Sequence, residues 1–103
     1  MIARLWHGAA SAVNADAYHR HFDSSVAPAL ACIPGNRGAW LLRREVDGEV
    51  EFLAITLWDS LEAIRAFAGD DVETAHVEPA ARAVLAGFDD VARHFEVVSR
   101  ADR

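Results

Sequence analysis

Histidines are the residues of this chain best suited to acid–base chemistry, because imidazole titrates near neutral pH; the sequence has five. His7 and His94 fall in the first and last predicted strands, which are neighbours in the sheet expected below. They fit either a hydrogen-bonded structural pair or a base and polar anchor in a pocket. His76 follows the second main helix in an irregular segment, where it is an exposed loop residue or part of a pocket lid. These three histidines are the candidate catalytic residues.

A metal centre is not expected. His19 and His21 lie two residues apart on a predicted helix, where their side chains point in nearly opposite directions and cannot chelate one ion. They are interpreted as surface residues. The other three histidines have no ligand spacing and no cluster of cysteines or carboxylates beside them.

Nucleophilic catalysis and nucleotide cofactors are also disfavoured. The serines lack the glycine-flanked setting of a nucleophile elbow. Cys32 lies in an apolar helix end with no histidine nearby in the sequence, so ionisation of its thiol to the reactive thiolate is disfavoured. The chain contains neither GxGxxG nor a P-loop. We therefore expect no cofactor.

Aromatic residues are the candidates for binding a substrate. Trp58 ends an apolar strand where a helix begins, a junction that often lines a pocket, and Phe67 lies on that helix. We expect these two residues to form a pocket wall, with Trp6 and Phe22 as further candidates. Each tryptophan, Trp40 included, also fits a place in the core or at an interface. The side chains of three arginines are suited either to an anionic substrate or to salt bridges: Arg37, Arg43 and Arg44.

Composition restricts the class of protein. The chain of 103 residues is 52% apolar and 25% charged, typical of one globular domain. Its net charge of −6, without a basic block, disfavours nucleic acid as a partner. No apolar run is long enough to span a bilayer, and residues 2–6 are too short for a signal peptide. One cysteine excludes an intrachain disulfide, so a cytoplasmic location is expected.

The first half of the chain reads as a strand followed by an interrupted helix. Residues 1–7 form the strand, and Asn14 is the predicted N-cap of the helix. Pro28 lacks an amide donor and predicts a kink or break near residues 24–27. The buried stripe recurs every four residues: Tyr18, Phe22, Val26 and Leu30.

A hairpin and a second helix come next. Asp47-Gly48 predicts a tight turn between strands over residues 39–46 and 50–58. The helix over residues 60–68 is expected to be capped by Asp59, with Glu62 completing a capping box and Gly69 ending it.

The remaining elements complete a known order. Pro79 begins a short third helix that ends at Gly87, and residues 92–99 form the last strand. The order β-α-β-β-α-(α)-β predicts an α+β, ferredoxin-like fold with a four-stranded antiparallel sheet over residues 1–99, followed by a polar tail over 100–103. The strands are apolar on both faces, so we expect a homodimer in which a second copy covers the free face of the sheet.

Four blocks resemble the antibiotic biosynthesis monooxygenase (ABM-domain) family, in particular its small stand-alone bacterial members. They are Arg4-Leu-Trp-His-Gly8, Pro34-Gly-Asn-Arg-Gly-Ala39, Leu57-Trp-Asp-Ser60 with the helix that follows it to Gly69, and His94-Phe-Glu-Val97. The resemblance covers nearly the whole chain. It implies a dimeric α+β barrel, in which two ferredoxin-like protomers pack through their sheets.

The resemblance also implies a range of activities. Some relatives oxygenate aromatic polyketides with O₂ and without metal or flavin, while others degrade haem with an asparagine, a tryptophan and a histidine. Here His76 falls near the histidine's place, Phe67 at the tryptophan's, and Trp6 or His7 at the asparagine's. The expected function is a cofactor-independent, monooxygenase-like enzyme acting on a small aromatic or quinol-type compound in a pocket between sheet and helices. The alternatives are a non-catalytic dimeric protein that binds a small ligand or serves in stress, and haem binding or degradation.

Overall fold

The computed structural model describes residues 1–102; residue 103, the end of the predicted tail, lies outside the described residues. Ten elements follow one another along the chain: β1 (Ile2–Ser11), α1 (Ala12–His21), the π-helical turn η1 (Phe22–Val26), α2 (Ala27–Ala31), β2 (Asn36–Val46), β3 (Glu49–Trp58), α3 (Leu61–Ala68), α4 (Pro79–Val84), β4 (Gly87–Phe88) and β5 (Arg93–Glu96).

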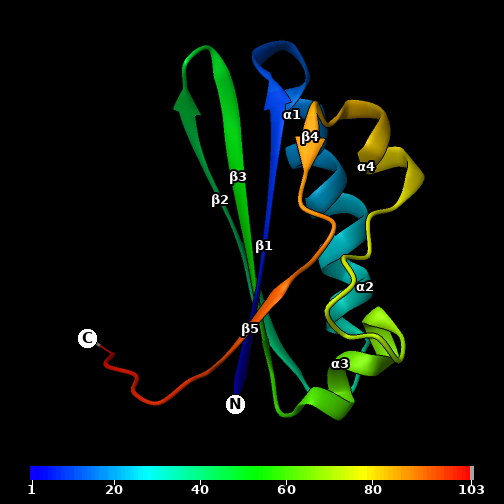
Figure 1. Ribbon diagram of the computed structural model, residues 1–103, viewed down its shortest axis with the longest axis vertical. Coiled ribbons are helices and arrows are strands. Elements are labelled where there is room, and N and C mark those ends of the chain that lie inside the picture. Colours follow the sequence, from blue (N-terminus) through cyan, green and yellow to red (C-terminus); the bar gives the residue numbers. More distant parts are fainter. Residues whose placement is uncertain (103) are drawn as a thin grey trace.

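The strands form one antiparallel sheet with β1 near its centre. Its order is β2-β3-β1-β4. Both β4 and β5 pair with β1, β4 at residues 8–9 and β5 at residues 2–5. All the helices cover one face of the sheet, and the other face is open (Figure 1). The α+β, ferredoxin-like prediction is confirmed.

The sheet has five strands rather than the predicted four, because β4 is an extra strand that the sequence did not predict. It begins at Gly87, where the third helix was expected to end, whereas α4 already ends at Val84. The predicted last strand, residues 92–99, is shortened to β5. Between β4 and β5 the backbone leaves β1 and bonds to the segment after α3. The amide of Ala75 donates to the carbonyl of Asp90, and the amide of Ala92 donates to that of Glu73.

The helical segment after β1 contains the predicted break. The amide of Ala27 donates to the carbonyl of Phe22, five residues back, and Pro28 has no amide to restore the ordinary pattern. The prediction of Asn14 as N-cap is wrong. Because β1 pairs with β3 as far as Ser11, the helix begins earlier and Ser11 caps it, accepting from the amide of Asn14 at 3.3 Å.

The hairpin and α3 follow the predicted pattern, with one exception. Asp47 and Gly48 have φ of 52° and 82°, as a tight hairpin turn requires, and Gly69 ends α3 at φ 86°. Asp59 does not cap α3. The cap is Ser60, whose hydroxyl accepts from the amide of Ala63 at 3.2 Å, while Asp59 binds Arg37.

The core is divided into two clusters. One gathers Tyr18, Val50 and Phe52 near one end of the sheet, and the other gathers Leu30, Trp58 and Ile64 near α3. Side chains packed against the two clusters meet across a gap between sheet and helices, and this gap is the cavity described next.

Candidate functional site

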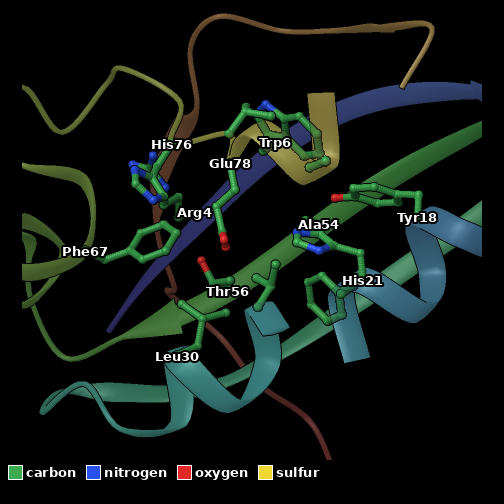
Figure 2. Close-up of a pocket in the computed structure, with 14 residues that line it drawn as sticks. Arg4, Trp6, Tyr18, His21, Leu30, Ala54, Thr56, Phe67, His76 and Glu78 are labelled. Carbon is green, nitrogen blue, oxygen red and sulfur yellow. The ribbon is translucent and has the colours of Figure 1, made fainter. Parts of the chain in front are cut away.

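A largely apolar cavity lies between the sheet and the helices. Its free volume, open mouth included, is about 640 Å³. Figure 2 shows side chains from β1, β3, the first helical segment and the α3–α4 segment converging on it. Its lining consists of Arg4, Trp6, Tyr18, His21, Phe22, Val26, Leu30, Ala54, Thr56, Phe67, His76, Val77, Glu78 and Ala81.

Three of the four aromatic residues predicted to bind substrate line this cavity: Trp6, Phe22 and Phe67. The Trp6 ring lies over Gly8, where a Cβ atom would come within 2.7 Å of it. Its indole N–H donates to the carbonyl of Asp89 at 2.9 Å. Because Gly8 has no side chain, the Trp6 ring can pack directly over it, and this contact fixes the position of the cavity wall that Trp6 forms.

Trp58 does not line the cavity, contrary to the sequence expectation. It is fully buried, and its indole N–H donates to the hydroxyl of Thr56 at 2.8 Å. Its ring packs behind Phe67, with centroids 5.9 Å apart. Trp58 thus supports the wall that Phe67 presents to the cavity.

Arg4 places a buried positive charge at the cavity. The residue is 4% exposed, and no carboxylate of the described residues forms an ion pair with it. Its guanidinium donates to the carbonyls of Val72 and Thr74 and lies 5.7 Å from the Phe67 ring centroid. Burial lowers the pKa of Arg4, although a guanidinium stays protonated at neutral pH.

His94 lies beside Arg4 but outside the cavity lining. The Arg4 Nη1 and His94 Nε2 atoms are 2.9 Å apart. Because a guanidinium only donates, Nε2 must accept, so His94 is neutral with its proton on Nδ1. The pKa of His94 is lowered, first by burial and then by the positive charge of Arg4. The negative charge of Glu73 offsets part of this shift. The geometry makes His94 a positioning partner of Arg4.

His76 and Glu78 reach the cavity from the segment that precedes α4. The imidazole of His76 lies edge-on to Phe67, with centroids 5.2 Å apart. The Glu78 carboxylate points into the cavity in Figure 2. Sequence reasoning missed Glu78, because the residue before a helix-starting proline reads as a turn residue.

His21 is another cavity residue that the sequence did not single out. It was interpreted as a surface residue, yet it lines the cavity, and its Nε2 atom is buried with no hydrogen-bond partner. Its spacing offered a signal, because His21 follows the buried Tyr18 by three residues and so lies on the same helical face. The π-helical turn begins immediately after it.

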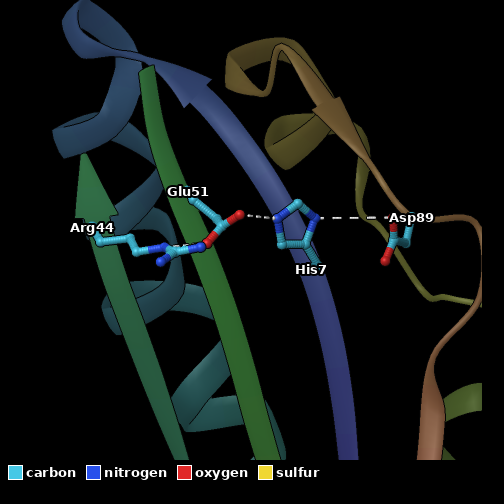
Figure 3. Close-up of polar contacts among 4 residues, drawn as sticks. All are labelled: His7, Arg44, Glu51 and Asp89. Atoms are coloured by element: carbon cyan, nitrogen blue, oxygen red, sulfur yellow. Dashed lines mark hydrogen bonds and ion pairs between the residues drawn. The ribbon is translucent and has the colours of Figure 1, made fainter. Parts of the chain in front are cut away.

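His7 lies on the opposite face of the sheet. Successive side chains of a strand alternate, so Arg4 and Trp6 face the helices and His7 faces the open side. There His7 is 2.9 Å from Glu51, which also binds Arg44, and 3.9 Å from Asp89 (Figure 3). A hydrogen bond from Arg44, and a weaker contribution from the hydrogen bond to His7, hold the pKa of Glu51 below its usual value. This network does not contact the cavity.

The arginines considered for anion binding form salt bridges. Arg37 pairs with Asp59, Arg43 with Asp16 and Arg44 with Glu51. In residues 1–102 no three histidine, cysteine or acidic side chains are grouped as metal ligands would be. Among the helices described, none combines the length and apolar character needed to cross a membrane.

Comparisons with known proteins give a match in structure. No protein-family model and no curated protein matches the chain. A solved structure of an MhuD mutant, with two manganese protoporphyrin IX molecules bound per active site, matches with a TM-score of 0.72 and 27% identity over the whole of both chains. The haem degrader MhuD from Mycobacterium tuberculosis, with two haems bound in its active site, matches with a TM-score of 0.68 and 25% identity, covering 99% of this chain and 100% of that one.

The chain belongs to the ABM-domain superfamily. The predicted resemblance is therefore confirmed. Within this ABM-domain chain the predicted site residues separate into two groups. His76, Phe67, Trp6 and Phe22 line one cavity, whereas His7, His94 and Trp58 lie outside it.

Proposed function

We propose that this protein is a monooxygenase-like enzyme that acts on a small aromatic or quinol-type compound in the cavity between sheet and helices. The observation that carries the proposal is the cavity itself, which has aromatic walls and a few polar groups directed inward. Such a site holds a flat apolar substrate away from water. The solved structures that match the chain are of a haem degrader, which supports oxidative chemistry on this fold.

A phenolic substrate needs no metal or flavin in this reaction, because it supplies the electrons itself. A base removes the hydroxyl proton, and O₂ adds to a ring carbon of the electron-rich phenolate. Loss of water then gives the quinone. One oxygen atom enters the ring, the other leaves as water, and the substrate loses four electrons. The protein contributes a positioned base and a dry cavity.

The proposed base is a histidine that faces the cavity, His76 or His21. His7 is on the other face of the sheet, and the Nε2 lone pair of His94 is engaged by Arg4. Phe67, Trp6 and Phe22 would hold the substrate ring.

Oxygen uptake with 1-naphthol tests this function. We expect 1,4-naphthoquinone carrying one atom of labelled oxygen from O₂. Removal of the base, in His76→Ala or His21→Phe, is expected to lower turnover about a hundredfold. His19→Ala is the matched control, because His19 is exposed and pairs only with Asp23. Turnover no faster than with heat-denatured protein, or unchanged in both cavity variants, would contradict the proposal; binding without turnover would favour a non-catalytic ligand-binding protein.

Haem is the second candidate substrate, because both matching structures hold haem or a manganese porphyrin and His76 faces the cavity here. Titration with haem would then give a shifted Soret band that His76→Ala weakens. An unshifted spectrum dismisses this alternative.

The proposed partner is a second copy of the chain. The open face of the sheet, opposite the helices, exposes Trp40, Leu42 and Phe95. A sheet face with such side chains is expected to be covered.

A further inference from the structure

We propose that the substrate is an aromatic carboxylic acid with a hydroxyl group at its far end, whose carboxylate binds Arg4 and whose hydroxyl binds His21. This inference rests on the proposed function, because it describes the substrate of the same cavity. It follows from two polar groups in the lining whose hydrogen-bonding capacity the protein leaves unused.

Arg4 is the first of these groups. Its partners are two carbonyls and a neutral imidazole, so no negative charge of the described side chains balances it at ion-pair distance. A guanidinium has five N–H groups, and the protein accepts only three of them. A buried charge without a counterion is costly, and an anionic ligand removes that cost.

A carboxylate is the anion that fits this guanidinium. Planar guanidinium and carboxylate groups pair through charge-assisted hydrogen bonds, often two at once. Phe67 lies beside the guanidinium, so an aromatic ring attached to the carboxylate meets an apolar surface next to its anchor.

Glu78 lines the same cavity and has the opposite sign of charge. Its carboxylate does not form an ion pair with Arg4 and therefore does not take the place of the ligand. It repels a bound anion instead. Removing its charge is expected to strengthen the binding of an acid, an effect opposite in sign to loss of Arg4.

His21 is the second unused group. Its buried Nε2 atom has no partner in the protein, and leaving such an atom unsatisfied is unfavourable. Figure 2 shows His21 beside Ala54 and Tyr18, at the end of the cavity away from Arg4, His76 and Phe67. A ligand anchored at Arg4 therefore directs its far end toward His21. This orientation assigns the phenolic proton to His21 rather than to His76.

Binding of four naphthalene compounds tests the inference by calorimetry, independently of turnover. They are 6-hydroxy-2-naphthoate, 2-naphthoate, 2-naphthamide and 2-naphthol. We expect the wild-type protein to bind 2-naphthoate at least tenfold more tightly than 2-naphthamide, the size of effect expected for hydrogen bonds to a charged group. The hydroxyl of 6-hydroxy-2-naphthoate is expected to add about fivefold, which His21→Phe abolishes while His19→Ala does not.

Substitutions of the two charges give opposite results. Arg4→Gln is expected to remove the preference for naphthoate over naphthamide, and Glu78→Gln to increase it. Because Arg4→Gln could fail to fold, the comparison of ligands on the wild-type protein stands by itself. Equal affinity for naphthoate and naphthamide overturns the inference even if 1-naphthol is oxidised. Preference for the acids without any oxygen uptake supports the inference for the ligand and removes the proposed reaction.

Discussion

Tyr18 joins the wall of the cavity to the core of the protein. It is buried, packs against Phe52 with ring centroids 4.7 Å apart, and lines the cavity. Burial raises the pKa of Tyr18 to about 12. It is the only tyrosine, and all the basic side chains are arginine or histidine. No lysine titration therefore overlaps that of Tyr18.

The raised pKa of Tyr18 predicts how the free energy of unfolding changes in alkaline solution. Between about pH 10 and about pH 12 the unfolded chain releases the phenolic proton, while the folded chain keeps it. The unfolded state then binds fewer protons, so the free energy of unfolding falls as pH rises, by roughly 2–3 kcal/mol in total. Denaturant unfolding at a series of pH values measures this slope.

Tyr18→Phe is the control, because it keeps the buried ring and removes the ionisable group. Its stability is expected to be nearly independent of pH over the same window. Tyrosinate absorbance that appears near pH 10 in the folded wild-type protein would contradict the prediction.

The helix α3 is the element that presents Phe67 to the cavity, and its position depends on its first turn. Ser60 caps this turn. We expect Ser60→Ala to lower the free energy of unfolding by about 1 kcal/mol, as loss of an N-cap does. Denaturant unfolding measures the change.

Asp59→Ala tests whether Ser60, and not Asp59, is the residue that caps α3. Asp59 only makes an exposed ion pair with Arg37, so its removal is expected to cost less than removal of the Ser60 hydroxyl. A larger loss in Asp59→Ala than in Ser60→Ala would restore Asp59 as the functional cap of α3.

Local sequence signals predicted the elements well where one residue's chemistry decides the backbone. The turn at Asp47-Gly48 and the helix end at Gly69 were predicted correctly, because these residues tolerate positive φ. The helix break was predicted from Pro28, because proline has no amide hydrogen to donate. The predicted cap of α3, Asp59, was wrong by one residue, since the side chains of Asp59 and Ser60 can both cap a helix. The extra strand β4 was also missed, because it depends on hydrogen bonds to β1, which is distant in sequence.

The site was less predictable than the fold, because membership of a cavity depends on which way a side chain points after packing. Trp58 and Phe67 both looked like wall residues, but the strand directs Trp58 into the core. The charge of Arg4 hid its burial, since arginine is seldom so enclosed. Its carbonyl partners come from a loop about 70 residues away.

At the scale of the whole molecule, the exposed apolar face of the sheet predicts a dimer. We expect the wild-type protein to sediment as a dimer at micromolar concentration. Leu42→Glu places a charge on the open face and is expected to raise the dimer Kd at least tenfold. Sedimentation analysis of both proteins measures the change.

Leu61→Glu is a closely matched control. Leu61 is 42% exposed and Leu42 is 48% exposed, but Leu61 lies on α3, on the helical side of the sheet. Its substitution is expected to leave the assembly unchanged. A monomeric wild-type protein, or equal effects of the two substitutions, would contradict the assignment of the open face as the dimer interface.

The alternation of β1 also limits how this protein can evolve. Arg4 and Trp6 serve the cavity, while Leu5 and His7 face the opposite side, so one strand carries two surfaces in alternate positions. Substitutions can change either surface without the other. A one-residue insertion or deletion within the strand would instead exchange them, turning Arg4 outward and Leu5 into the cavity. Changes in the length of β1 should therefore be tolerated only in steps of two residues or at its ends.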